Sequence, residues 1–205
     1  MGSLVLAYPM FQQIRKRYPE AKLYGLLFEK NKEILKLLDV TEPENILTIR
    51  DTAFGVFAID CLRVLNRIRK LKVDVVIDCE LFARISSIFS FLSGARIRAG
   101  FHPYTQEGLY RGNFINRPVL FNPYHHMSKQ FLTLAAAVDS VDVPKAKQPL
   151  GRTNLRAPLI DFNRYEIDAM QARLRADFSA IADKRLVLLS PGAGILPIKA
   201  WPRNY

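Results

Sequence analysis

Residues 74–101 read DVVIDCELFARISSIFSFLSGARIRAGF, and this stretch decides the fold class. Its first five residues, DVVID, form the short apolar run that is typical of a strand covered on both faces in a parallel sheet. A helix is predicted from about residue 81 to residue 92, because Ser93 and Gly94 provide a stop, and a second strand follows over residues 97–101. A strand, a helix and a strand in this order predict an α/β fold built on a parallel sheet.

The same alternation extends in both directions from this unit. On the N-terminal side, the apolar periodicity predicts a helix over residues 4–18 that ends before Pro19, and then a strand, a helix, a strand and a helix at residues 23–28, 31–38, 45–49 and 54–72. On the C-terminal side it predicts a long polar and aromatic loop over residues 102–122, with a hairpin near residues 111–113. A helix from residue 125 to about residue 138 follows.

Composition divides the chain into two predicted domains. Residues 1–142 suit a Rossmann-like domain, residues 143–162 a linker, and residues 163–205 the start of a second Rossmann-like domain. In the second domain, a helix over residues 163–182 precedes a strand that begins at Arg185. That strand needs further elements to bury its faces, and no strand precedes the first helix. We therefore expect the chain to be truncated at the C-terminus and at the N-terminus, and inactive by itself.

The net charge of the chain indicates which classes of binding partner are favoured. The chain carries 30 Lys and Arg against 19 Asp and Glu, which gives a net charge of +11. This charge favours acidic partners, such as phosphorylated substrates or anionic lipid surfaces, and no zinc-finger, helix-turn-helix or RNA-recognition signature points to nucleic acid. Only two cysteines are present, and there is no signal-like or membrane-spanning apolar run, so the sequence predicts a cytoplasmic protein.

Polar residues follow directly on the strand at residues 74–78. Asp78, Cys79 and Glu80 stand at its carboxyl end, where ligands bind in open α/β sheets. Arg84 stands in the first turn of the next helix, where a cation opposes the helix dipole, so it either faces an anionic ligand or is simply solvated. For Asp78 and Glu80 the alternative to a catalytic role is that they cap or orient the backbone.

Two further groups of cationic or titratable residues have a structural alternative. Arg63, Arg67 and Lys70 share one face of the helix at residues 54–72. Either this face binds an anion, or it is the solvated outer face of a helix whose other face packs on a sheet. His125 and His126 are adjacent, so they lack the spacing of three or four residues that lets a helix hold a metal ion. We expect helix capping or substrate contact from them.

A second ligand-binding pattern lies near the C-terminus. Residues 186–202 read LVLLSPGAGILPIKAWP, an apolar strand followed by a turn with Gly192 and Gly194. Glycines at the carboxyl end of a strand let backbone N–H groups approach an anion, and Lys199 adds a positive charge beside it. The pattern therefore indicates a phosphate-binding loop, although a plain loop accounts for the same glycines.

Taken together, these elements resemble glycosyltransferase family 9, which includes the ADP-heptose:lipopolysaccharide heptosyltransferases. The resemblance covers nearly the whole chain, and it depends on the order and spacing of its motifs. These are Gly2-Ser3 followed by Pro9 and Tyr18-Pro19, DVVIDCELFARISS at residues 74–87, residues 94–101, NPYHHMSKQ at residues 122–130, and SPGAG with KAWP between residues 190 and 202.

The resemblance implies a GT-B fold, in which two Rossmann-like domains face a cleft. The N-terminal domain contacts the acceptor, an anionic lipopolysaccharide core or another bacterial surface glycan, and the C-terminal domain holds the nucleotide sugar, ADP-heptose in the heptosyltransferases. The reaction it implies is an inverting displacement that needs no metal and no cofactor, with peripheral contact to the inner-membrane surface. The residues it implies for the acceptor are Arg84, His125 and Lys129, and those for the donor phosphates are Ser190, Gly192, Ala193, Gly194 and Lys199.

The catalytic base is the point at which this sequence departs from the family. An Asp or Glu commonly follows the first glycine there and deprotonates the acceptor hydroxyl, whereas this chain has Ser3. A serine hydroxyl lacks the basicity of a carboxylate near neutral pH. Glu80 or Asp78 is then the replacement, unless both are capping carboxylates. A non-catalytic glycan- or lipid-binding relative is the alternative to a glycosyltransferase, and nucleic-acid binding has only the charge in its favour.

Overall fold

Two small parallel sheets organise the first of two units in the chain. The computed structural model describes residues 2–81, 83–102, 112–140, 157–181, 184–189 and 201. The two units are Met1–Ile160 and Asp161–Tyr205. In the first unit, β1 (Gly25–Phe28) pairs with β2 (Ile46–Ile49), and β3 (Val75–Asp78), β4 (Ile97–Phe101) and β5 (Arg117–Val119) form a second sheet in that order. All pairings are parallel, as the alternation of elements predicted.

The helices of the first unit lie where the apolar periodicity placed them, with small shifts at their ends. The first predicted helix is divided at Ala7, since Pro9 stands in the first turn of the second segment and has no N–H to donate. The bounds are α1 (Gly2–Leu6), α2 (Tyr8–Arg17), α3 (Lys32–Leu37), α4 (Phe54–Leu71), α5 (Arg84–Leu92) and α6 (Met127–Ala137), with short 3₁₀ segments η1 (Glu29–Asn31), η2 (Pro43–Asn45) and η3 (Gly112–Phe114).

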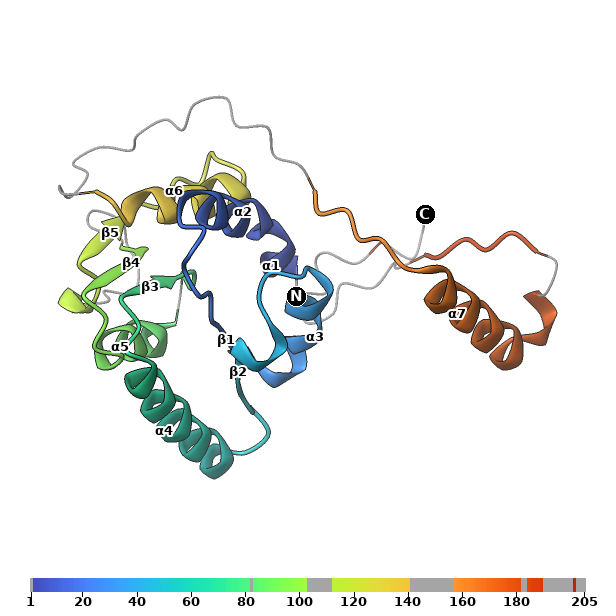
Figure 1. Cartoon of the computed structure of the whole chain (residues 1–205), viewed down its shortest axis with the longest axis horizontal. Helices are drawn as coiled ribbons and strands as arrows, with labels where there is room; N and C mark the ends of the chain where they lie inside the picture. Colours follow the sequence, from blue (N-terminus) through green and yellow to red (C-terminus); the bar gives the residue numbers. More distant parts are fainter. Residues whose placement is uncertain are drawn as a thin grey trace. The chain divides into compact units, whose positions relative to one another are not determined.

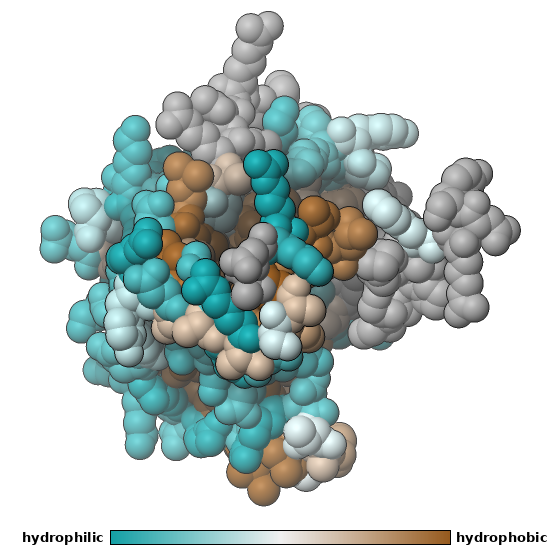
Figure 2. Space-filling model, turned by 90° about the vertical axis from the view of Figure 1, so that its right-hand side faces the viewer, coloured by the Kyte–Doolittle hydropathy of each residue, from teal (hydrophilic) through white to brown (hydrophobic). Residues whose placement is uncertain are grey.

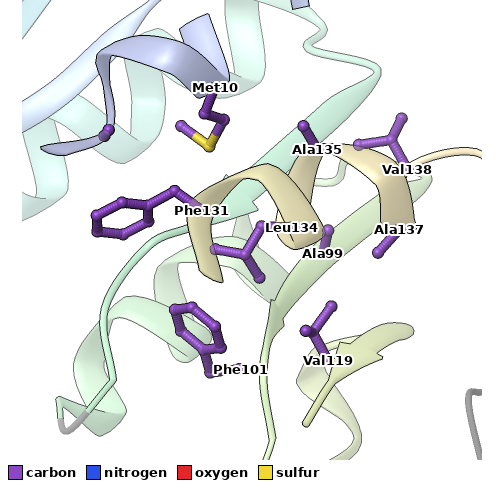
Figure 3. Close-up of a cluster of buried hydrophobic side chains, with 10 residues drawn as sticks. Met10, Ala99, Phe101, Val119, Phe131, Leu134, Ala135, Ala137 and Val138 are labelled. Carbon is purple, nitrogen blue, oxygen red and sulfur yellow. The ribbon is translucent and has the colours of Figure 1, made fainter. Parts of the chain in front are cut away.

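Helix α6 is the centre of the largest core cluster. Seven of its eleven residues are buried, because α2 packs on one side of it and β4 and β5 pack on the other (Figure 1). Figure 3 shows Leu134 between α6 and Phe101 of β4, with Met10 of α2 on the opposite side of the helix. A helix that is buried on several sides is a core element, so α6 fixes the position of the loops that precede it.

Helices α4 and α5 cover the other face of the sheets (Figure 1). Val64 and Ile68 of α4 pack on Leu47 and Ile49 of β2, which confirms the predicted apolar face of this helix. The loop between β2 and α4 is fixed by Asp60 of α4, whose side chain is inaccessible to solvent. Its carboxylate accepts hydrogen bonds from the Arg50 guanidinium, at 2.8 and 3.0 Å, and from the Arg50 backbone N–H at 3.0 Å.

Helix α5 buries serines on the sheet, in addition to Phe89, which packs against the cluster of Leu47, Ile49, Val64 and Ile68. Ser87, Ser90 and the C-cap residue Ser93 are buried, while Ile85 and Ile88 are 44% and 41% exposed. Each buried hydroxyl donates to a carbonyl three or four residues earlier, so its polar group is satisfied within the helix. Small side chains at this spacing let α5 approach β3 and β4 closely.

The structure differs from the sequence prediction on both sides of β4. Residues 112–114 form a 3₁₀ turn, and the strand that follows, β5, runs parallel to β4. Residues 103–111, where the predicted hairpin would begin, lie outside the described residues. Strand β5 itself was missed, because RPV is too short to show a strand pattern. The helix predicted from residue 81 begins at Arg84, because the carboxylates of Asp78 and Glu80 bond the backbone N–H groups of Glu80 and Leu81.

The described residues of the second unit include one α-helix, which has three to four turns. Asn163 and Glu166 form a reciprocal capping box at the start of α7 (Arg164–Asp177), and the 3₁₀ turn η4 (Ser179–Ile181) follows. The strand predicted from Arg185 is not found: residues 185–189 pair with no described strand, and Leu188 is 92% exposed. An apolar run becomes a strand only where a neighbouring strand accepts its hydrogen bonds, and its own sequence does not supply that neighbour.

Candidate functional site

The candidate site is the carboxyl edge of the sheet formed by β3, β4 and β5. Because the three strands are parallel, the segments that follow Asp78, Phe101 and Val119 start from the same edge. Asp78 lies opposite Gly100 in the register, and Phe101 lies opposite Val119. Carboxylates, imidazoles and amides follow these strand ends, so the topology gathers chemically active groups from distant parts of the sequence.

Asp78 and Glu80 hold the loop that follows β3. Asp78 is buried, and its Oδ1 accepts the backbone N–H of Glu80 at 3.0 Å. Glu80 is exposed, and its Oε1 accepts the backbone N–H of Leu81 at 3.1 Å. Both carboxylates therefore orient backbone, as their structural alternative predicted. Of the two, Glu80 is the carboxylate that a dissolved substrate can reach.

Cys79 lies between these carboxylates in sequence, and its thiol is a poor nucleophile. Burial, with smaller contributions from the negative charges of Asp78 and Glu80, raises the pKa of its thiol to about 12. The thiolate is the nucleophilic form of cysteine, and this pKa keeps it protonated near neutral pH. Cys61 is also a free thiol with a raised pKa, so neither cysteine is an activated nucleophile.

Gly100 gives the backbone of β4 its close approach to β3 and to the loop before β5. A Cβ at this position would lie 3.1 Å from Cδ1 of Ile115 and 3.3 Å from Cβ of Asp78. Two residues after Gly100, His102 is buried, and its backbone N–H donates to the carbonyl of Val119 at 2.9 Å. A side chain at residue 100 would push on Asp78, so this glycine sets the position of the carboxylate.

The segment after β5 is held by Asn122 and Gln130, the first and last residues of the NPYHHMSKQ stretch, to which the sequence pattern assigned no role. The buried side chain of Gln130 accepts the Asn122 backbone N–H at 3.2 Å and donates to the Asn122 carbonyl. The Asn122 side chain in turn accepts the backbone N–H of Tyr124 at 3.1 Å. A separation of eight residues matches no periodicity of a helix or a strand, so the sequence pattern does not predict these hydrogen bonds. They depend on the packing of α6.

The two histidines have different environments within this segment. His126 caps α6, since its Nδ1 accepts the Ser128 backbone N–H at 3.3 Å, which confirms the predicted capping. His125 is half-buried, and Lys129 lies half-buried in the first turn of α6. These are the two acceptor-binding candidates after β5.

Two other predicted residues lie on helices at their exposed ends. Arg84 is the first residue of α5 and is exposed to solvent. Ser3 is exposed in α1, where its carbonyl accepts the backbone N–H of Ala7 at 3.0 Å. The predicted donor-phosphate residues, Ser190, Gly192, Ala193, Gly194 and Lys199, lie outside the described residues.

The described residues show neither a metal-binding cluster nor a membrane-spanning helix. No three side chains of His, Cys, Asp or Glu among them gather closely enough to hold a metal ion. In the same part of the chain, every helix is too short or too polar to cross a membrane. The site as described offers one accessible carboxylate, one half-buried imidazole and two cationic side chains.

Comparison with known proteins gives no assignment. No protein-family model matches the chain, and no curated protein matches it either.

Proposed function

We propose that this chain belongs to a nucleotide-sugar-dependent glycosyltransferase that acts on an anionic bacterial surface glycan, such as a lipopolysaccharide core, and that its first unit contacts the acceptor. The observation that carries the proposal is that Glu80, Arg84, His125 and Lys129 stand on the segments that follow β3 and β5, two strands whose carboxyl ends lie at one edge of a parallel sheet. This edge is where open α/β sheets bind ligands. The resemblance of the sequence motifs to glycosyltransferase family 9 supports the same function.

The proposed reaction assigns a role to each group. Glu80 accepts the proton of an acceptor hydroxyl, and the oxygen attacks the anomeric carbon of the sugar from the face opposite the diphosphate. The bond between the anomeric carbon and the diphosphate oxygen breaks, and its electron pair leaves with the diphosphate, whose growing charge Lys199 and the turn at residues 192–194 stabilise. Arg84 and Lys129 pair with the phosphates of the acceptor.

Product analysis of Glu80→Gln tests this assignment. The assay measures transfer and hydrolysis with a panel of nucleotide sugars, for this chain and for the product of the longest reading frame that contains it. Loss of a general base lowers the rate by about 10²- to 10⁴-fold while nucleotide-sugar affinity is retained. Glu20→Gln, on an exposed loop residue away from the sheet edge, is the matched control. Equal turnover in Glu80→Gln and wild type contradicts the catalytic role of Glu80.

The donor half of the proposal has its own test. Lys199→Ala is expected to weaken nucleotide-sugar binding, measured by isothermal titration calorimetry, because a positive charge beside the diphosphate is lost. Unchanged affinity contradicts the donor-site assignment.

A non-catalytic glycan-binding protein is the second candidate function. It is favoured by Ser3 at the expected base position and by the engagement of Asp78 and Glu80 with backbone N–H groups. Tight glycan binding without turnover of any nucleotide sugar supports it, and transfer activity refutes it.

A further inference from the structure

The helices of the first unit form two layers, and each layer continues across both of its sheets. The first layer contains α1, α2, α3 and α6, since Phe11 of α2 packs both on the cluster around α6 and on the cluster of α3 that contacts Leu27 of β1. The second layer contains α4 and α5, since Phe89 of α5 packs on the cluster that joins Val64 of α4 to Leu47 of β2. Among the described residues, however, no ladder joins β1–β2 to β3–β4–β5. The sheet is therefore interrupted where its helix layers are not.

Strands β1 and β3 expose more apolar surface than β2 and β5, which lie at the other ends of the two sheets. Leu26 and Phe28 of β1 are 41% and 42% exposed, and Val75 of β3 is 37% exposed, whereas Leu47 of β2 and Val119 of β5 are buried. Parallel strands are normally buried on both faces, because helices and neighbouring strands cover them. The exposure at β1 and β3 therefore indicates that both strands lack a neighbour.

Exposed apolar side chains carry this meaning at a strand edge but not on a helix. The lowest part of the molecule in Figure 1 and Figure 2, at the amino end of α4, is also apolar in colour. A helix forms its ladder of hydrogen bonds within itself. The edge of a strand, by contrast, presents N–H and C=O groups that a neighbouring strand satisfies.

The connections between the strands indicate where a further strand belongs. Helix α3 connects β1 to β2 in the first layer, whereas α4 connects β2 to β3 in the second. Because crossovers are right-handed, connections that run in one direction across a parallel sheet place their helices on one face, and those that run the opposite way use the other. Helices α1 and α2, which lead to β1, lie in the layer of α3. A strand that leads into α1 therefore lies on the side of β1 away from β2, between β1 and β3.

We propose that the position between β1 and β3 binds one further parallel strand, an apolar segment of the same polypeptide that leads into α1. Four residues are enough to pair with β1 and β3, each of which has four. A helix layer meets each face of this strand, so its side chains are apolar on both sides. Its ladders continue those of β1–β2 and β3–β4 and join the two sheets into one. Packing and topology carry this proposal, independently of the proposed glycosyltransferase activity.

Hydrogen–deuterium exchange tests the proposal on the 205-residue chain and on the product of the longest reading frame that contains it. We expect the amides of β1 and β3 to exchange about tenfold or more slowly in the longer product, because ladder hydrogen bonds form on their second edges. The amides of β2 and β5 keep the neighbours they have and should change less. Equal exchange of β1 and β3 in the two proteins, equal slowing of all four strands, or a longest reading frame that begins at Met1 would overturn the proposal.

A matched pair of variants tests the position of the strand. Leu37 of α3 is 42% exposed, nearly as much as Leu26 of β1, so Leu26→Gln and Leu37→Gln should shift the melting temperature of the 205-residue chain by similar small amounts. In the longer product, Leu26→Gln should lower the melting temperature by several degrees more than Leu37→Gln, because the further strand covers Leu26. Equal shifts in the longer product would contradict the position between β1 and β3. A dimer of the 205-residue chain, detected by light scattering, in which β1 and β3 already exchange slowly would assign the position to a second copy and overturn the proposal.

Discussion

Asp60 is the residue whose environment departs most from that of an ordinary surface carboxylate. It stands in the middle of an amphipathic helix, and it is inaccessible to solvent because Arg50 meets it with both its guanidinium and its backbone N–H. Hydrogen bonds from Arg50, with the nearby charge of Arg63, hold the pKa of Asp60 well below its usual range. The ionised carboxylate of Asp60 therefore links α4 to Arg50, the residue that follows β2.

Asp60→Asn should destabilise the protein near neutral pH. The folded-state pKa of Asp60 is below the unfolded value, so its contribution to stability is present above the unfolded pKa and is lost as the pH falls toward the folded pKa. Urea unfolding at several pH values should show a large difference in the free energy of unfolding at pH 7, and the difference should shrink below about pH 4.

Asp51→Asn is the control for that experiment. Asp51 pairs with Lys30 on the surface, and side-chain hydrogen bonding by Lys30 lowers its pKa as well. Exposed ion pairs contribute little, so this variant should unfold almost as wild type does. If Asp60→Asn lowered the free energy of unfolding by the same amount at every pH, the ion pair with Arg50 would not be the source of the stabilisation.

Gly100→Ala should destabilise the sheet by about 1–3 kcal/mol, because the added methyl group overpacks Ile115 and the Cβ of Asp78. Gly55→Ala is the matched change in α4, where a new Cβ meets nothing within 4 Å. It should be neutral or should stabilise by up to about 1 kcal/mol, as alanine is the better helix former. Chemical denaturation of both variants measures the contrast, and equal effects would contradict the close approach at Gly100.

At the scale of elements, α5 shows where an apolar pattern misleads. A helix normally buries its large apolar residues, yet in α5 Ser87 is 1% exposed and its neighbour Ile88 is 41% exposed. Ser87→Ile should therefore cost about 1–3 kcal/mol through overpacking. Ile88→Ser should cost less than Ser87→Ile, because 41% of the Ile88 surface is exposed, and urea unfolding of both variants measures the ranking. The reverse ranking would mean that α5 packs through its isoleucines.

Residues 75–78 and 186–189 make the complementary point about strands. Both are short apolar runs, but VVID lies beside β4 and is a strand, whereas LVLL meets no described partner and is not. The local pattern specifies an extended, buried-type segment, while the ladder of hydrogen bonds depends on a neighbour. Strand β5 shows the converse, since three residues without a strong pattern become a strand because β4 offers its edge.

At the scale of the first unit, the core is centred on α6. Leu134 has no accessible surface and packs among residues of α2, β4 and β5 (Figure 3). Leu134→Ala should cost about 2–5 kcal/mol, because it removes buried methyl groups and leaves a cavity. Leu159→Ala, at an exposed leucine, should stay within about 0.5 kcal/mol of wild type. A small loss in Leu134→Ala would contradict the close packing of α6, and guanidinium unfolding of both variants measures it.

The sequence by itself determined the order of elements from α2 to β4, because strand runs, helical periodicity, Pro19 and Ser93-Gly94 act within a few residues of one another. It also placed Asp78, Glu80, Arg84 and His125 at element ends, where ligands bind. Only the tertiary structure decided which carboxylate is accessible, which side of α5 is buried, and that Gln130 locks Asn122. These features depend on contacts between residues that are distant in sequence, and local propensity contains no information about such contacts.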